Sequence, residues 1–338
     1  MAEGFLNRQL KTIDVFKKMP KDMSEGSIFG FMMTIGCFVL LLILVSNELI
    51  QYYSYSVEKG LTIDQKLDHN EVTVHLDILF PKHPCHLLGL DIVDYVGTHR
   101  MNLHGNIQKF AVKENGEHIR EMPYAYPEDE VIKDFKRALK EKEGCRLEGS
   151  FEVLLVPGNF HIGFHSFGQY LNMILGSGVN LNVNFEHEIR HLSFGTEHSR
   201  AEWDNFKKTY ELEDLSTVEG YSTNQMTPSP GPFSYHYKLM IFPTNLVGAN
   251  GAKFQVYQYR SFWNVAYLEN GFNYLASFDY ELSQVTMEHK LTRKSLSKLL
   301  IDLSGIIGGI ISFMTVFHLL MQKTVMKVLY KDSIGKLA

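Results

Sequence analysis

The sequence of 338 residues lacks the signatures of the common enzyme classes and of nucleic-acid binders. It contains no G-x-S-x-G elbow, no phosphate-binding P-loop, no dinucleotide fingerprint and no C-x-x-C pair. It has no basic block, and its net charge is only −5, so a nucleic-acid partner is not expected. These absences favour a non-catalytic protein without a cofactor.

Long uncharged runs, by contrast, are present near both ends. Residues 28–45 form an uncharged stretch of 18 residues, and residues 303–321 form one of 19 in which only His318 titrates. Each approaches the ~20 residues that a helix needs to cross the hydrocarbon core of a bilayer. The first run starts too far from the N-terminus and is too long for a cleaved signal peptide. We therefore predict two transmembrane helices, at 28–50 and 299–321.

Basic residues on either side of the first run predict the orientation. Five precede it and two follow it closely: Arg8, Lys11, Lys17, Lys18 and Lys21, then Lys59 and Lys66. Cytosolic flanks are enriched in lysine and arginine, so residues 1–27 and 322–338 are expected in the cytosol. The basic cluster just before the second run opposes this assignment, but the first span usually dominates. Residues 51–298 then form one lumenal domain.

Strand patterns dominate residues 51–298. The runs that read as strands cover 71–80, 150–156, 179–185, 234–242 and 252–263. Asn250-Gly251 lies between the last two and favours a hairpin turn. One helix is predicted at 128–144, where Val131, Phe135 and Leu139 recur every fourth residue, and 196–232 reads as a long polar loop. The expected fold class is a membrane protein in which two transmembrane helices flank a large β-rich, two-sheet, sandwich-like lumenal domain with one notable helix.

The stretch HEIRH, from His187 to His191, matches the H-E-x-x-H signature of zinc proteases. The apolar residues before it recur at every second position, and Ile189 keeps that period, which is typical of a strand. On a strand, four residues span about 13 Å, whereas a zinc–nitrogen bond is about 2 Å long. We therefore predict no protease site and assign no metal. The same objection applies to His161 and His165, although cross-strand pairing of the four histidines stays open as an alternative.

Several blocks along the chain resemble the Erv family of endoplasmic-reticulum-derived COPII vesicle proteins, also called the ER–Golgi intermediate compartment family. The blocks are SNELIQYYSYSV, LDILFPKHPCHLLGLDIVD, EGCRLEGSFEVLLVPGNFH, HLSFG, FDYELS and SGIIGGI, in this order. The resemblance implies a cargo receptor subunit in the membranes of the ER, the intermediate compartment and the Golgi, with pH-dependent retrieval. It also implies a paralogous partner, lumenal cargo proteins, cytosolic coat components and the lipid bilayer as binding partners.

The chain departs from the family pattern at several points. No cysteine lies between Cys85 and Cys145, the tail GKLA has no paired lysine, Gln284 stands where proline is frequent, and no N-x-S/T sequon is present. These departures favour an alternative function, a non-catalytic structural subunit of a larger membrane assembly built on the same fold.

The resemblance also implies a disulfide between Cys85 and Cys145, because both lie in family blocks of the lumenal domain, where oxidation is permitted. Two buried free thiols are the alternative. Cys37 lies in the first span and is expected to be an inert buried thiol.

Small residues on the second span form a face that lets helix backbones approach in lipid. We expect it to pack on the first span or on a partner's helix; its members are Ser304, Gly305, Gly308, Gly309 and Ser312.

Histidines are concentrated in the predicted lumenal domain, with 14 of the 15 between residues 61 and 290. Histidine titrates near pH 6.5, so a mildly acidic compartment would charge some of them. The candidates for pH sensing lie in or beside the family blocks GNFH and HLSFG: His161, His165, His187 and His191.

Overall fold

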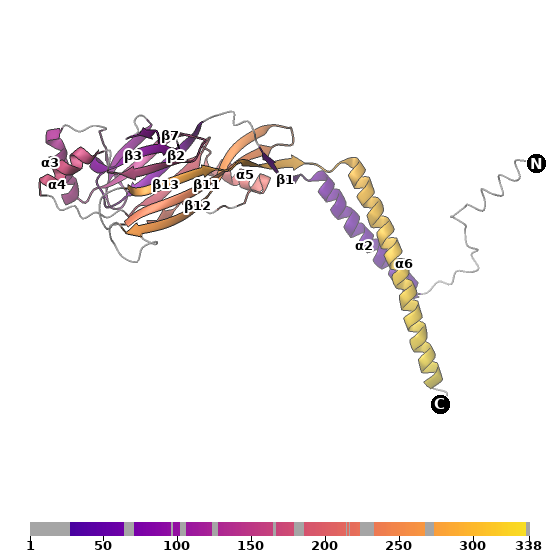
Figure 1. Cartoon of the computed structure of the whole chain (residues 1–338). Coiled ribbons are helices and arrows are strands. Elements are labelled where there is room, and N and C mark those ends of the chain that lie inside the picture. Colours follow the sequence, from indigo (N-terminus) through magenta and orange to yellow (C-terminus); the bar gives the residue numbers. More distant parts are fainter. Residues whose placement is uncertain are drawn as a thin grey trace, which may run out of the picture. The chain divides into compact units, whose positions relative to one another are not determined.

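The computed structural model describes residues 28–63, 71–95, 97–101, 106–123, 128–164, 167–178, 186–213, 215, 217–223, 233–267 and 274–335. The chain divides into two compact units (Figure 1). Unit 1 consists of Met1–Ser56 and Arg293–Ala338, and unit 2, called here the β-domain, is Val57–Thr292.

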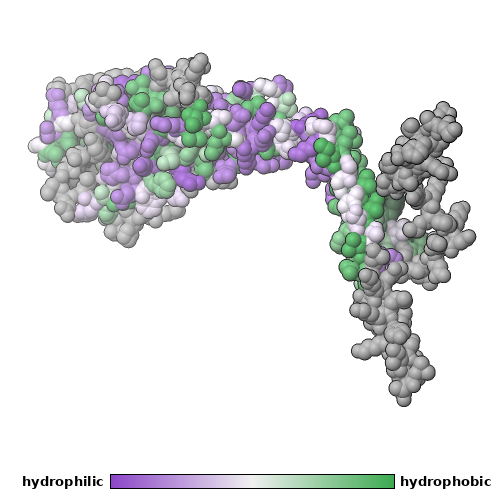
Figure 2. All heavy atoms as spheres, turned by 45° about the vertical axis from the view of Figure 1, so that its right-hand side comes forward, coloured by the Kyte–Doolittle hydropathy of each residue, from purple (hydrophilic) through white to green (hydrophobic). Residues whose placement is uncertain are grey.

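Two long helices make up the described part of unit 1. They are α2, Ile28–Tyr53, and α6, Leu296–Gly335. Their segments Phe31–Tyr53 and Leu296–His318 are long and apolar enough to cross a membrane, and Figure 2 shows apolar side chains over their surface. The predicted spans fall within these helices. The second helix continues past its span because residues 322–334 contain neither glycine nor proline to end it.

Charged residues join the two helices at one end. The Lys294 ammonium forms ion pairs with Glu48 of α2 and, at 2.7 Å, with Asp302 of α6. The Arg293 guanidinium lies 4.2 Å from the centroid of the Tyr55 ring. Two of the basic residues that opposed the predicted orientation therefore have partners within the unit.

The described strands of the β-domain form two sheets. The first has the order β1-β14-β11-β13-β8-β3-β4, with β12 on β11. Its strands are β1 Ser56–Ile63, β14 Val285–Thr292, β11 Phe233–Val247, β13 Tyr274–Leu282, β8 Gly158–Gly163, β3 Gly89–Asp94, β4 His99–Arg100 and β12 Lys253–Tyr267. The second has the order β10-β9-β2-β7-β5-β6. Its strands are β10 Tyr221–Ser222, β9 Glu188–Phe194, β2 Glu71–Phe80, β7 Gly144–Leu154, β5 Ile107–Val112 and β6 His118–Glu121.

The core lies between the two sheets. Alternate residues of β2, from Val72 to Phe80, are buried as the period of two predicts. From the other sheet, the rings of Phe160, Tyr237 and Phe278 stack at centroid distances of 4.8 Å. Both sets belong to one hydrophobic cluster. The predicted fold class, two apolar helices flanking a two-sheet β-domain, is confirmed.

The hairpin predicted at Asn250-Gly251 is also confirmed. Strands β11 and β12 pair antiparallel up to Val247 and Lys253, on either side of the turn. The Gly251 amide donates to the Gly248 carbonyl at 2.9 Å, and Gly251 has a φ of +82°. Glycine adopts this left-handed conformation without the steric cost that a Cβ would bring.

The helix predicted at 128–144 is present as α3, Glu128–Lys140, but the described part of the β-domain contains two further α-helices, α4, Gly168–Gly176, and α5, Arg200–Tyr210. The prediction of a loop over 196–232 is therefore wrong at Arg200–Tyr210, where the chain forms α5. Ser199 and Glu202 form a capping box there, and Trp203, Phe206 and Tyr210 pack at helical spacing beside Leu246 and Val256. The strand predicted at 179–185 lies outside the described residues.

Candidate functional site

The two histidines of HEIRH diverge in the structure. His187 is buried, and its Nε2 lies 2.8 Å from the Tyr237 hydroxyl. His191 lies on β9 with its side chain 38% exposed and forms an ion pair with Glu219. The strand prediction is confirmed for residues 188–191, which belong to β9, while His187 lies just before the strand, and the two rings have different partners.

His191 is surrounded by acidic groups. Its Nδ1 lies 2.8 Å from Glu219 Oε1, and its Nε2 lies 2.9 Å from Ser193 Oγ. Asp77 of β2 is its partner in the sheet register, and the Glu197 carboxylate is also close enough to act on it. The hydrogen bond to Glu219 raises the pKa of His191 above its ordinary value, more than partial burial lowers it, and the charges of Glu219, Glu197 and Asp77 add to the rise.

Glu219 holds the segment 217–220 against β9. Its Oε1 accepts a hydrogen bond from the Leu192 amide at 3.1 Å, and the Gly220 amide donates to the Ile189 carbonyl at 2.8 Å. Burial works to raise the pKa of Glu219, but the hydrogen bonds from His191 and Leu192 outweigh it and lower the pKa. The pair is therefore an ion pair under mildly acidic conditions, and it connects β9 to the segment that leads into β10.

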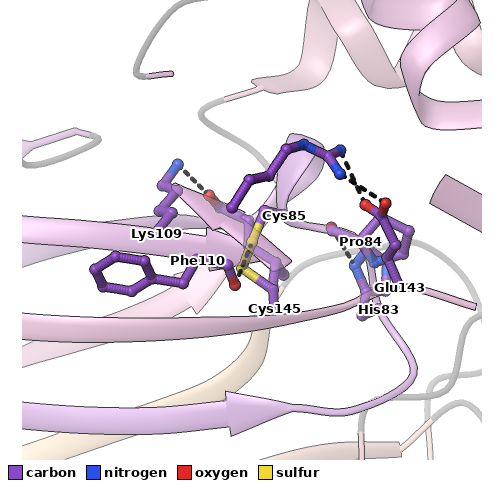
Figure 3. The surroundings of a disulfide bond; sticks show 9 residues. His83, Pro84, Cys85, Lys109, Phe110, Glu143 and Cys145 are labelled. Carbon is purple, nitrogen blue, oxygen red and sulfur yellow. Dashed lines mark hydrogen bonds and ion pairs between the residues drawn. A yellow bond between two sulfur atoms is a disulfide. The ribbon is translucent and has the colours of Figure 1, made fainter. Parts of the chain in front are cut away.

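Two further histidines, His83 and His86, lie close to Cys85 in the sequence, and their pKa values shift in the opposite direction; Figure 3 shows His83 near the disulfide. His83 is buried, and its Nδ1–H donates to the Pro84 carbonyl at 3.0 Å. Burial lowers its pKa to about 4. The His86 Nε2–H donates to Asp134 at 2.9 Å, but burial still lowers the pKa of His86. The His83 ring therefore stays neutral as the pH falls to mildly acidic values, and burial disfavours protonation of His86 as well.

Cys85 and Cys145 are joined by a disulfide in the structure (Figure 3). Cys85 begins the short helix η2, Cys85–Leu87, and Cys145 lies near the start of β7. Both are buried. Beside them, Arg120 binds the buried Glu143 carboxylate through two hydrogen bonds of 2.7 and 3.0 Å. The disulfide therefore links the segment after β2 to the start of β7.

The small residues of α6 all lie on its exposed side. Leu299 and Ile310 are buried on the side that packs against α2. Successive helical residues turn by about 100°, which places Gly308 on the far side of the helix from this pair and Gly305 and Gly309 on its flank. A Cβ added at Gly305, Gly308 or Gly309 would meet no atom within 4 Å among the described residues. Within the chain, the small-residue face does not pack on α2.

His161 belongs to a polar cluster that the sequence patterns did not reveal, and His165 lies outside the described residues. His161 on β8 is buried directly opposite Asp91 of β3, and the His99 ring of β4 lies 6.0 Å from the His161 ring. One signal was available, since Asp91 is an acid inside the apolar run LLGLDIV, which indicates a buried carboxylate. The hydrogen-bond partners of His86 and Glu219 lie more than 25 positions away in the sequence, so no local pattern marked these contacts.

Comparison with known proteins identifies similar sequences over most of the chain. The family described as Endoplasmic Reticulum-Golgi Intermediate Compartment (ERGIC) matches residues 10–101, and the family described as Endoplasmic reticulum vesicle transporter matches residues 126–318. Endoplasmic reticulum-Golgi intermediate compartment protein 1 of Xenopus laevis is 26% identical over 88% of this chain and 89% of its own length. The ER-derived vesicles protein ERV46 of Saccharomyces cerevisiae is 23% identical over 55% of this chain and 61% of its own length. The crystal structure of Erv41p covers 68% of this chain and 99% of that chain, with 15% identity and a TM-score of 0.46.

Proposed function

The chain belongs to the endoplasmic reticulum vesicle transporter family, and on that premise we propose that it is a subunit of a cargo receptor that retrieves lumenal proteins in a pH-dependent manner. The family acts in transport between the ER and the Golgi, and its members are membrane proteins of these compartments. It is a family of transport proteins, in agreement with the prediction that the chain is not an enzyme. In this proposal both termini are cytosolic and the β-domain is lumenal.

The ion pair between His191 and Glu219 is the observation that carries the pH dependence. The folded pKa of His191 is raised above the ordinary value of about 6.5, so the pair contributes its full stability below that value and loses it as the pH rises through the folded pKa. The pKa values of His83 and His86 are lowered, so these two histidines contribute no comparable stabilisation as the pH falls below about 6.5. The acid-dependent stabilisation comes from the pair of His191 and Glu219. Mild acidity therefore favours the conformation in which segment 217–220 is held on β9.

We predict that His191→Gln removes the pH response of cargo binding. Full-length tagged protein would be purified gently from cells at pH 7.2 and at pH 6.0, and the soluble lumenal proteins that accompany it would be quantified. In the wild type we expect the amounts of these proteins to differ by about fivefold or more between pH 7.2 and pH 6.0, because coupling between two sites typically changes an affinity by at least this factor. The variant should bind equally at both, because glutamine does not titrate.

His236→Gln is the matched control, because His236 is bonded to the neutral hydroxyl of Ser234 rather than to a carboxylate. It should respond to pH as the wild type does. A wild type that binds the same proteins equally at both values would contradict the mechanism. If a fixed set of membrane subunits co-purified with the protein and soluble lumenal proteins did not, the result would favour the alternative of a structural subunit in a larger membrane assembly.

A paralogous partner is the second part of the proposal, and two surfaces support it. The small-residue face of α6 is exposed within the chain, and such faces allow close helix packing in lipid. In the β-domain, β12 pairs with β11 alone among the described strands and exposes Phe254, Phe262 and Trp263. Long apolar sheet edges are normally covered, since they otherwise promote aggregation. A second chain of the same fold would cover both surfaces.

We expect the double variant Gly305→Leu and Gly309→Leu to recover about tenfold less of the paralogous partner, because leucine holds the partner's backbone away from α6. The measurement is the amount of the partner that co-purifies from mild detergent. Ile307→Leu with Ile311→Leu adds the same side chains to another exposed face of α6 and should leave recovery unchanged. Equal recovery from the two double variants would show that the small-residue face does not bind the partner.

A further inference from the structure

Three potential metal ligands lie together on one face of the sheet formed by β4, β3 and β8. Asp91 is directly opposite His161 in the β3–β8 register, and His99 pairs with Val93, two residues from Asp91. Leu90 and Ile92 point into the core, so Asp91 and its neighbours point to the opposite face. Asp91 is nevertheless 0% exposed and His161 1% exposed. Buried charged groups of this kind are paired or coordinate metals.

The distances within this cluster suit a single ion. One ligand atom from each of Asp91, His99 and His161 lies within 4.8 Å of the other two, and His161 Nε2 is 3.8 Å from Asp91 Oδ2. Around a tetrahedral zinc ion with bonds of about 2.0–2.2 Å, ligand atoms are about 3.3 Å apart. The His99 side chain is exposed, so its ring can turn toward the other two ligands, and His161 and Asp91 need to approach each other by only about 0.5 Å.

The other side of the His161 ring is held in the orientation that a metal ligand needs. Its Nδ1–H donates to the Asn159 Oδ1 at 2.7 Å. The Asn159 amide in turn donates to Ser277 Oγ at 2.7 Å and to Asp279 Oδ1 at 2.5 Å. This chain of hydrogen bonds leaves the lone pair of Nε2 directed toward Asp91. Metal-binding histidines are typically oriented by such an outer hydrogen bond.

We propose that Asp91, His99 and His161 bind a divalent transition-metal ion, with zinc as the best match. Two imidazoles and one carboxylate form the ligand set of open zinc sites, in which a fourth position is left for water or another donor. The ion would join β4, β3 and β8 on this face of the sheet. This site is independent of the transport role, since it depends only on the ligand geometry.

The test uses the full-length protein in detergent, stripped with a chelator, reloaded with zinc chloride and desalted. We expect about one zinc per chain by mass spectrometry and a dissociation constant below about 1 µM in competition with a chromophoric chelator. Cobalt added to the stripped protein should give the visible absorption of a four-coordinate site. Asn159→Ala should weaken zinc binding by about 10- to 100-fold, the usual effect of losing an outer-shell hydrogen bond.

His161→Gln, Asp91→Asn and His99→Gln should each weaken binding by about 100-fold or more, since each removes a ligand. His99 is exposed, so His99→Gln keeps the test valid if a buried variant does not fold. His236→Gln, which changes a histidine bonded to Ser234, should bind as the wild type does. A wild type that binds no more zinc than His99→Gln would overturn the proposal and leave Asp91 and His161 as a direct ion pair.

Discussion

Replacing Cys85 and Cys145 together by alanine is expected to reduce the free energy of unfolding of the β-domain by about 4 kcal/mol. The two positions are 60 residues apart, so the bond removes a large loop from the conformations open to the unfolded chain. For a domain of this size the loss corresponds to a fall of about 8–16 °C in the melting temperature.

The measurement is thermal unfolding of the full-length protein in detergent, followed by tryptophan fluorescence with and without reductant. Reductant should lower the melting temperature of the wild type to near that of the double variant. Cys37→Ala removes the free cysteine of α2 and should have little effect. If peptide mapping without reductant found both Cys85 and Cys145 as free thiols, the disulfide and the proposed lumenal location would both be contradicted.

Gly149→Ala is expected to cost roughly 3 kcal/mol or more, because two independent effects act at this position. Gly149 lies in β7 opposite Ile107 of β5 and has a φ of +149°, which side chains other than glycine rarely adopt. A Cβ there would lie 1.8 Å from the Asn106 carbonyl oxygen. This oxygen is backbone, so the clash is relieved only by separating β5 from β7.

Thermal unfolding of the same preparation tests this expectation, with a predicted fall of about 6–12 °C. The control is Gly60→Ala in β1, where an added Cβ has no atom within 4 Å among the described residues and φ lies outside the left-handed region. It should unfold close to the wild-type temperature. If the two alanine variants unfolded together, the strain inferred at Gly149 would be wrong.

The elements that local patterns specify were predicted from the sequence. Uncharged runs identified both apolar helices, the period of two identified β2, and Asn250-Gly251 identified the hairpin of β11 and β12. These features depend on neighbours only a few residues apart, so they can be read along the chain. Helix α5 was missed although its capping box is equally local, because the polar composition around it outweighed the spacing of its aromatic residues.

The order and register of the strands were decided only by the tertiary structure. Strand β11 pairs in parallel with β13 and with β14, an arrangement that no local period encodes. The same register brings Asp91 and His161 together across 70 positions and leaves His187 and His191 with different partners. A strand pattern says which face a side chain takes, but not which strand will lie beside it. The sequence alone therefore determined the fold class and the family, whereas the strand register decided which histidines lie beside carboxylates and which are buried among apolar side chains.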